Sequence, residues 1–337
     1  MKRKGLAIIC CLLVAFSAFF MGCERRAAGD GVTRLQLGFV LPIDGHYGMG
    51  LQEFARLAYL YSNGTVIIEI FPDGMLGNER DLIEGVGLGT VPMALSASGP
   101  FGLFFPEFQI IDMPFLFPTK EIAWEVLDGE IGQELLELMR PQGIVGLAFH
   151  ENGFRSITNN VRPIHTPADL TGLRIRTLEN DIMMDAVARL GASPLPMAFG
   201  EVFMAMQQGV IDGHDNPALL IEASRFNEVQ RYFSITMLFY SPTVIIMNER
   251  VYERLTAEQQ RAIRRAATES AVWQRNFSRD NDLYSIERLR AAGMQVNFID
   301  DFSQFVALTQ GTYEAFAHRI NQDWVRKIRE IAARHGH

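Results

Sequence analysis

Short apolar runs alternate with longer stretches of helical spacing in the first part of the chain. Residues 34–42 alternate and then stay apolar, as a buried strand does, while residues 65–72 form a β-branched run that ends in proline. Helical spacing covers residues 49–62 and 77–88, and residues 91–99 form a third strand-like run. This β-α-β-α-β order predicts a mainly parallel sheet with helices on both faces.

The same kind of pattern restarts further along the chain. Helical stretches at residues 181–191 and 199–209 separate new apolar runs. The strand-like runs cover residues 144–153, 154–158, 173–177, 193–197 and 209–216. We therefore expect a second α/β lobe and assign the chain to the α/β class with two lobes, each built on a mainly parallel sheet flanked by helices.

One helical run is much longer than the others. Thr256 and Gln259 form a capping-box pattern, residues 257–292 contain no glycine or proline, and Gly293 is placed to end the helix. At about 1.5 Å per residue such a helix would be about 50 Å long, against roughly 30 Å for a small domain. We expect it to cross both lobes. Two ordinary helices with a break near Asn281 are the alternative.

The first residues have the pattern of an export signal. A basic start precedes an apolar run up to residue 21, which predicts a signal peptide over residues 1–22. Gly22 and Cys23 resemble the end of a bacterial lipobox, so we expect Cys23 to carry acyl chains and residues 23–32 to be a linker. The protein would then be periplasmic and anchored to a membrane by lipid, each buried methylene contributing about 0.8 kcal/mol. Ordinary cleavage near Gly22 is the alternative.

Charge and motif content exclude several classes of function. The net charge of −8 and the lack of a dense basic stripe disfavour nucleic acid as a partner. The histidines are scattered, and no zinc-protease, nucleophile-elbow or Walker motif occurs, so we predict no enzyme activity, no metal and no cofactor. Asp212, His214 and Asp215 leave acid–base chemistry as a minor alternative.

Two arginines alternate on one predicted strand. Within residues 173–177, Leu173 and Ile175 share one face, and Arg174 and Arg176 occupy the other positions. The strand pattern alone leaves open whether Arg176 is exposed or points into a cleft.

Several long segments, taken in order, resemble one family. Together they look like the solute-binding subunit of tripartite ATP-independent periplasmic (TRAP) transporters of the dicarboxylate-binding type, over about residues 33–330. The finer resemblance is to a lipoprotein branch that works with a tetratricopeptide-repeat partner. The segments are FPDGMLGNERDLIEGVGLGTVPMALSASGPF, DMPFLF, FRSIT, LRIRT, LGASPLPMAFGEVFMAMQQGVIDGHDNP and VYERLTAEQQRAI.

The resemblance implies a function without chemistry on the ligand. Two lobes would close on a small organic anion and deliver it to a sodium-driven membrane permease. Strands crossing between the lobes would make each lobe discontinuous, with residues 33–152 plus about 242–281 in lobe I and residues 153–241 plus about 282–330 in lobe II. The alternative is a lipoprotein that senses solute and docks on a protein partner without feeding a permease.

The resemblance also assigns ligand contacts. Arg176 matches the arginine that pairs with the ligand carboxylate, and Arg155 matches a second cleft arginine, with a salt bridge between lobes as its alternative role. Asn216 matches a residue that hydrogen-bonds the ligand, and Phe199 matches an aromatic residue packed against it. Glu79 matches an acidic residue that reaches the ligand in some members.

Departures from the sugar-acid-binding pattern bear on the ligand. Val40 and Ala97 stand where such members carry polar side chains, which favours a carboxylate with an apolar body. Tyr240 is expected to contact the ligand, and three further side chains are expected either to line the cleft or to belong to the core: Met183, Met184 and Phe239.

Overall fold

The computed structural model describes residues 32–337, so the predicted signal peptide, Cys23 and most of the linker lie outside the described residues. The strands join in the order β2-β1-β3-β8-β4-β7-β5-β6, with β9 paired to β8. Their bounds are β1 Thr33–Gly38, β2 Val66–Phe71, β3 Met93–Ala97, β4 Ile144–Asn159, β5 Arg174–Thr177, β6 Ser193–Pro196, β7 Gly213–Asn216, β8 Tyr232–Asn248 and β9 Gln295–Phe298.

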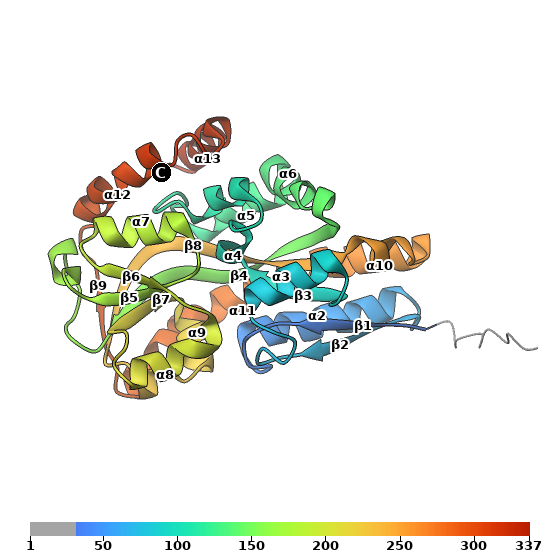
Figure 1. The fold of residues 1–337 in the computed structure, drawn as a ribbon, viewed down its shortest axis with the longest axis horizontal. Helices are drawn as coiled ribbons and strands as arrows, with labels where there is room; N and C mark the ends of the chain where they lie inside the picture. Colours follow the sequence, from blue (N-terminus) through green and yellow to red (C-terminus); the bar gives the residue numbers. More distant parts are fainter. Residues whose placement is uncertain (1–31) are drawn as a thin grey trace, which may run out of the picture. The chain divides into compact units, whose positions relative to one another are not determined.

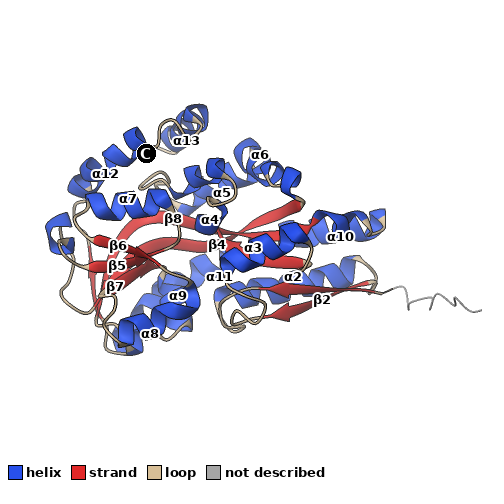
Figure 2. Cartoon of the chain, viewed as in Figure 1, coloured by secondary structure: helices blue, strands red, loops and turns tan. Residues whose placement is uncertain are grey.

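Helices lie on both faces of this sheet (Figure 2). The α-helices are α2 His46–Tyr61, α3 Glu79–Leu88, α4 Ser98–Phe101, α5 Lys120–Asp128, α6 Glu130–Leu138, α7 Asp181–Arg189, α8 Val202–Gln207, α9 Ala218–Ala223, α10 Glu249–Glu253, α11 Ala257–Ala291, α12 Ser303–Ala315 and α13 Gln322–Arg334. The short 3₁₀ helices are η1 Pro106–Asp112, η2 Arg140–Gln142, η3 Pro167–Leu170, η4 Phe199–Glu201 and η5 Phe226–Glu228.

Two long strands connect the two lobes. β4 and β8 pair antiparallel along their whole length, from Ile144 opposite Asn248 to Asn159 opposite Tyr232. One half of β8 also pairs with β3, and the other half pairs with β9. We call the part around β1, β2 and β3 the first lobe and the part around β5, β6 and β7 the second lobe. The pairs β1–β3, β5–β6 and β5–β7 are parallel, as predicted, and β8–β9 is parallel as well, whereas β3–β8 and β4–β7 are antiparallel.

The separate strands expected at residues 144–153 and 154–158 form one strand. Its pairing with β8 shifts register between Glu151 and Gly153, and Gly153 has a φ of 124°. A left-handed backbone at this point suits glycine and bends the strand without ending it. The sequence break that we expected is therefore a bulge inside a crossing strand.

The core consists of three clusters of buried apolar side chains. One lies between the sheet and helices α2 and α11, with Leu37, Phe54 and Ile263 fully buried. A second fills the first lobe between the sheet and helices α3, α5, α6 and α13. The third belongs to the second lobe and contains Ile175 and Val187. Each lobe thus holds apolar side chains that fix its strands.

The predicted long helix is confirmed as one continuous element of 35 residues. Thr256 accepts a hydrogen bond from the backbone of Gln259, whose side chain accepts one from the backbone of Thr256, and this capping box starts the helix. No break occurs at Asn281, whose amide bonds to the Phe277 carbonyl within the helix. α11 contacts α2 in the first lobe and α9 in the second, so it crosses both.

The C-terminal helices contact both lobes as well. α12 packs on α7, whereas α13 packs on α5; Figure 1 draws the two C-terminal helices in dark red. The indole of Trp324 donates to Glu134, and Lys327 pairs with Glu130, both on α6. Among residues 32–337, no helix combines the length and apolar character needed to cross a membrane.

Candidate functional site

A small cavity of about 10 Å³ lies where ends of strands from both lobes meet. Seven of the eight ligand contacts predicted from sequence line it: Val40, Glu79, Ala97, Arg155, Arg176, Phe199 and Asn216. The other lining residues are Leu41, Tyr47, Asn152, Leu178 and Leu220. The structure therefore brings together residues that are up to 176 positions apart in the chain and that the family resemblance had grouped.

Arg176 is the cavity residue with an unused charged donor. The side chain is 1% exposed, and its Nε and Nη2 donate to the Met197 carbonyl oxygen at 2.9 and 2.6 Å. Its Nη1 is buried and has no hydrogen-bond partner within residues 32–337. Burial, and then the nearby Arg155, lower the pKa of Arg176 to about 10, which still leaves it charged at neutral pH.

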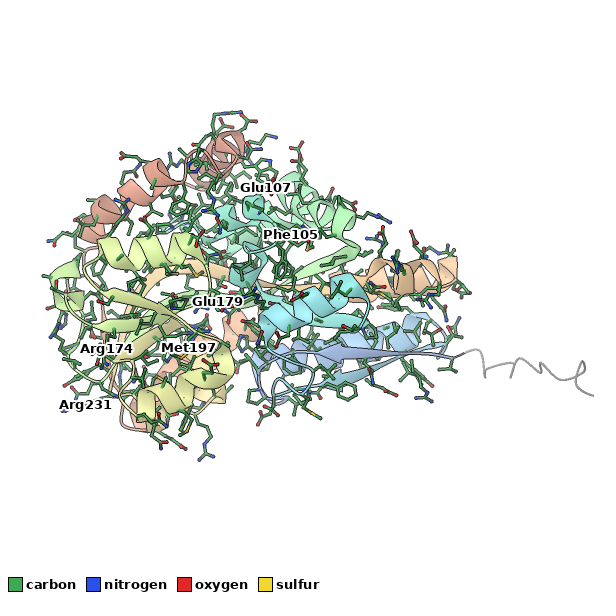
Figure 3. The ribbon with its side chains drawn as sticks, in the orientation of Figure 1. Phe105, Glu107, Arg174, Glu179, Met197 and Arg231 are labelled. Carbon is green, nitrogen blue, oxygen red and sulfur yellow. The ribbon has the colours of Figure 1, made fainter. Side chains whose placement is uncertain are left out.

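Arg174 belongs to a different environment. Its Nε and Nη2 bind the carboxylate of Asp212 at 3.0 and 2.7 Å, and 43% of its side chain is exposed. In Figure 3 the labelled Arg174 lies toward the outer edge, and Met197, the partner of Arg176, lies farther in. Residues two apart on a strand share a face, so it is the different partners, Asp212 for Arg174 and the Met197 carbonyl for Arg176, that give the two arginines different environments.

Arg155 forms a buried ion pair. Its Nε donates to Asp215 Oδ2 at 2.6 Å, and its Nη2 donates to Asp215 Oδ1 and to the Asp215 carbonyl. Asp215 lies on β7, and Arg155 directly precedes the part of β4 that pairs with β7, so both residues lie in the second lobe and the alternative of a salt bridge between lobes is wrong. Burial alone would raise the pKa of Asp215, but the Arg155 guanidinium outweighs burial and the pKa is lowered.

The ion pairs of Asp212 and Asp215 also argue against acid–base chemistry at residues 212–215. Asp212 and Asp215 each hold an arginine, and burial lowers the pKa of His214 to about 3, which keeps the ring neutral. The ring Nδ1 of His214 lies 3.0 Å from the amide nitrogen of Asn216 and so orients that side chain beside the cavity. Within the described part of the chain, no three His, Cys, Asp or Glu side chains are grouped to hold a metal ion.

Glu79 links the first lobe to the site. It starts α3 directly after the cap residue Asn78, and its Oε1 accepts a hydrogen bond from the Ala97 backbone at 2.8 Å. Burial raises the pKa of Glu79.

The two cavity arginines differ in their charge partners. Asp215 neutralises Arg155, whereas the side-chain nitrogens of Arg176 form no ion pair with a carboxylate of residues 32–337.

Sequence reasoning missed Asn152, which lines the cavity from the crossing strand β4. Its amide is buried, faces His46 and has no well-formed hydrogen bond to any described residue. It directly precedes the bulge at Gly153, which re-aims the side chains beside it, and because the bulge depends on pairing with β8 no local sequence signal marks this residue.

Tyr240 does not join this set. Its hydroxyl donates to Glu151 at 2.6 Å, and its ring packs against Phe117 and Phe154. Met183 and Phe239 are fully buried in the core cluster of the second lobe, away from the lining residues. The apolar surface of the cavity comes from smaller side chains: Val40, Leu41, Ala97, Leu178 and Leu220.

Comparison with known proteins places this geometry in a family. The model of the bacterial extracellular solute-binding proteins, family 7, matches residues 39–319. The chain belongs to this family. Its members are the solute-binding proteins of TRAP transporters, which bind substrates and are not enzymes.

Individual relatives agree along nearly the whole chain. A solute-binding protein of Verminephrobacter eiseniae is 37% identical over 303 residues, which is 90% of each chain. A TRAP solute-binding protein of a Polaromonas species, bound to D-erythronate, is 40% identical with a TM-score of 0.86 and covers 88% of this chain and 98% of its own. A Bordetella relative with density assigned as pantoate is 36% identical with a TM-score of 0.86, covering 89% and 99%.

Proposed function

We propose that this TRAP solute-binding protein captures a small hydroxymonocarboxylate by closure of its two lobes and delivers it to the membrane permease of the transporter. The observation that carries the proposal is the unpartnered Nη1 of Arg176 in a cavity lined by both lobes. A buried guanidinium donor gains about 1.5–3 kcal/mol from a charged hydrogen bond. A ligand carboxylate would supply that bond on closure.

The lining supports a ligand that carries both apolar carbon and hydroxyl groups. Val40, Ala97 and Leu220 offer apolar contact, whereas Asn152 and Asn216 offer amide groups to hydroxyls. Erythronate and pantoate, named for the two structural relatives above, are both 2-hydroxy acids built on a four-carbon main chain, and the chain of pantoate also carries two methyl groups. We propose an acid of this size, with pantoate matching the apolar wall better than erythronate.

Calorimetry on matched arginine variants tests the proposal. Pantoate, D-erythronate and succinate would be titrated into the wild type, Arg176→Ala and Arg174→Ala. We expect Arg176→Ala to lower affinity at least tenfold, which is about 1.4 kcal/mol. Arg174→Ala removes an arginine of the same strand that pairs with Asp212 on the surface, and it should change affinity less than twofold.

Unchanged binding in Arg176→Ala, with a normal melting temperature, would reject the role of this arginine. Native mass spectrometry of the wild type as purified would identify any acid that it carries. That measurement is independent of the choice of the three test acids.

The lobe boundaries are part of the proposal. Placing them at residues 152–153 and 241–242 is supported by the bulge, where Glu151 pairs with Pro242 and Gly153 with Ser241. The packing of α13 on α5 favours counting residues 322–334 with the first lobe, whereas the boundaries expected from the sequence assign residues up to about 330 to the second.

The attachment and the transport partners are further proposals. We infer that Cys23 is lipidated, that the permease is coupled to sodium, and that a tetratricopeptide-repeat protein is an additional partner. Cys23→Ser should move the protein from the membrane fraction to the soluble periplasmic fraction. Uptake of the bound acid should stop when the permease genes are deleted, and uptake that continues would favour a sensing role.

A further inference from the structure

A buried side chain at the start of α7 reaches from the second lobe into the first. Asn180 caps α7, with its Oδ1 accepting a hydrogen bond from the Met183 backbone at 3.0 Å. Its amide nitrogen donates to the Gly99 carbonyl at 3.1 Å and to Asp112 Oδ2 at 2.8 Å. The side chain is 1% exposed, so three polar contacts satisfy it inside the protein.

Asp112 completes the contact from the other side. Its Oδ1 accepts a hydrogen bond from the Ser98 hydroxyl at 2.6 Å, and that hydroxyl lies 3.4 Å from the hydroxyl of Ser241 on β8. Asp112 is fully buried, and burial raises its pKa to about 7. Both carboxylate oxygens of Asp112 therefore accept hydrogen bonds, and Ser98 connects Asp112 to Ser241 on the crossing strand β8.

The partners belong to different lobes. η1, which ends at Asp112, places Phe108 and Ile110 in the core cluster of the first lobe. α7, which Asn180 starts, places Met183 and Val187 in the core cluster of the second. The hydrogen bonds from Asn180 to Asp112 and Gly99 consequently cross between lobes.

The backbone is also unusually close at this point. A Cβ atom built on Gly99 would lie 2.7 Å from Cδ1 of Leu178 and 3.1 Å from its Cβ. Leu178 follows β5 and lines the ligand cavity. Any side chain at position 99 would therefore push against the second lobe next to the cavity.

Resting on closure as proposed above, we infer that Gly99, Asp112 and Asn180 form a closure latch that holds the lobes together without touching the ligand. None of the three lines the cavity around Arg155 and Arg176. Contacts made only in the closed form raise the closed population, and the apparent affinity for a ligand that needs this form rises in proportion. The latch thus sets affinity through the lobe equilibrium.

Two variants remove the latch by different means. Gly99→Ala places a methyl group against Leu178, and Gly200→Ala is its matched control because no atom lies within 4 Å of a Cβ at position 200. Asn180→Asp keeps an oxygen to cap α7 but sets a carboxylate against Asp112 in place of the amide donor. Adding Asp112→Asn to Asn180→Asp restores a donor and an acceptor with their places exchanged.

The readouts are calorimetry with pantoate and D-erythronate and small-angle X-ray scattering with and without ligand. We expect Gly99→Ala and Asn180→Asp to lower the affinity for both acids at least fivefold and by equal factors. Both variants should also enlarge the radius of gyration of the ligand-free protein. The exchange variant should recover at least half of the lost binding free energy, and Gly200→Ala should match the wild type.

Binding within twofold of the wild type in both variants, or weakened binding with scattering unchanged, would overturn the latch. Failure of the wild type to bind any of the acids would instead count against the proposed function. The scattering of the ligand-free variants would still test the latch in that case.

Discussion

Gln274, in the middle of α11, holds the crossing strand β4 by its backbone. Its Oε1 accepts a hydrogen bond from the Glu151 amide at 2.7 Å, and its Nε2 donates to the Glu151 carbonyl at 2.9 Å. The side chain is fully buried. Because the register of β4 and β8 shifts between Glu151 and Gly153, the glutamine amide provides the pairing that the sheet lacks there.

Gln274→Ala should therefore be strongly destabilising. It leaves the N–H and the C=O of Glu151 buried without partners, each at a cost of about 1–3 kcal/mol, so we expect a loss of about 2–6 kcal/mol in unfolding free energy. Urea denaturation followed by circular dichroism would measure it. Thr268→Ala on the same helix is the control, since within residues 32–337 the hydroxyl of this exposed side chain bonds only to the Arg264 carbonyl of its own helix.

A loss below about 1 kcal/mol for Gln274→Ala would contradict this reasoning, because it would mean that water reaches the Glu151 backbone. In that event α11 would not be the element that supports the bend between the lobes. A loss of the same size in Thr268→Ala would also contradict it, since the effect would then belong to the helix as a whole.

Two further predictions concern charge. Burial lowers the pKa of His150 to about 3, so this ring stays neutral in the folded protein at a pH at which the unfolded chain, with its ordinary pKa near 6.5, binds a proton. The contribution of this neutral ring to the free energy of unfolding is present above pH 6.5 and is lost as the pH falls. Between pH 6.5 and 5, the wild type should therefore lose about 2 kcal/mol more unfolding free energy than His150→Gln, as measured by urea denaturation. Parallel pH dependences of the two proteins would refute this. Asn216→Asp places a carboxylate beside the cavity, so calorimetry should show at least tenfold weaker binding of pantoate at pH 7, whereas equal or tighter binding would show that Asn216 is remote from the ligand.

The larger elements could be predicted because each rests on a strong local signal. The capping box at Thr256 and the run without glycine or proline gave α11 almost to the residue. The sequence pattern predicts two strands where the structure has the crossing strand β4, and pairing with β8 on both sides of the bulge at Gly153 keeps this strand continuous. A bulge depends on a partner that is distant in sequence, so local pattern does not reveal it.

At the candidate site, too, the features that depend on partners distant in the sequence could not be predicted from local pattern. Arg174 and Arg176 differ because Asp212 binds the first and the Met197 carbonyl binds the second, and neither partner is visible in the strand itself. The resemblance to a known family supplied the choice of Arg176. The lining includes Asn152, which the sequence did not indicate, and does not include Tyr240, because the bulge at Gly153 affects which nearby side chains reach the cavity.

The central claim is that the Arg176 guanidinium holds the ligand carboxylate between the closed lobes. A crystal structure of the protein with pantoate or D-erythronate tests it most directly. We predict a carboxylate oxygen within hydrogen-bond distance of Arg176 Nη1, with Met197 still bound to Nε and Nη2. A carboxylate bound away from Arg176, with Nη1 still unpartnered or turned to solvent, would contradict it.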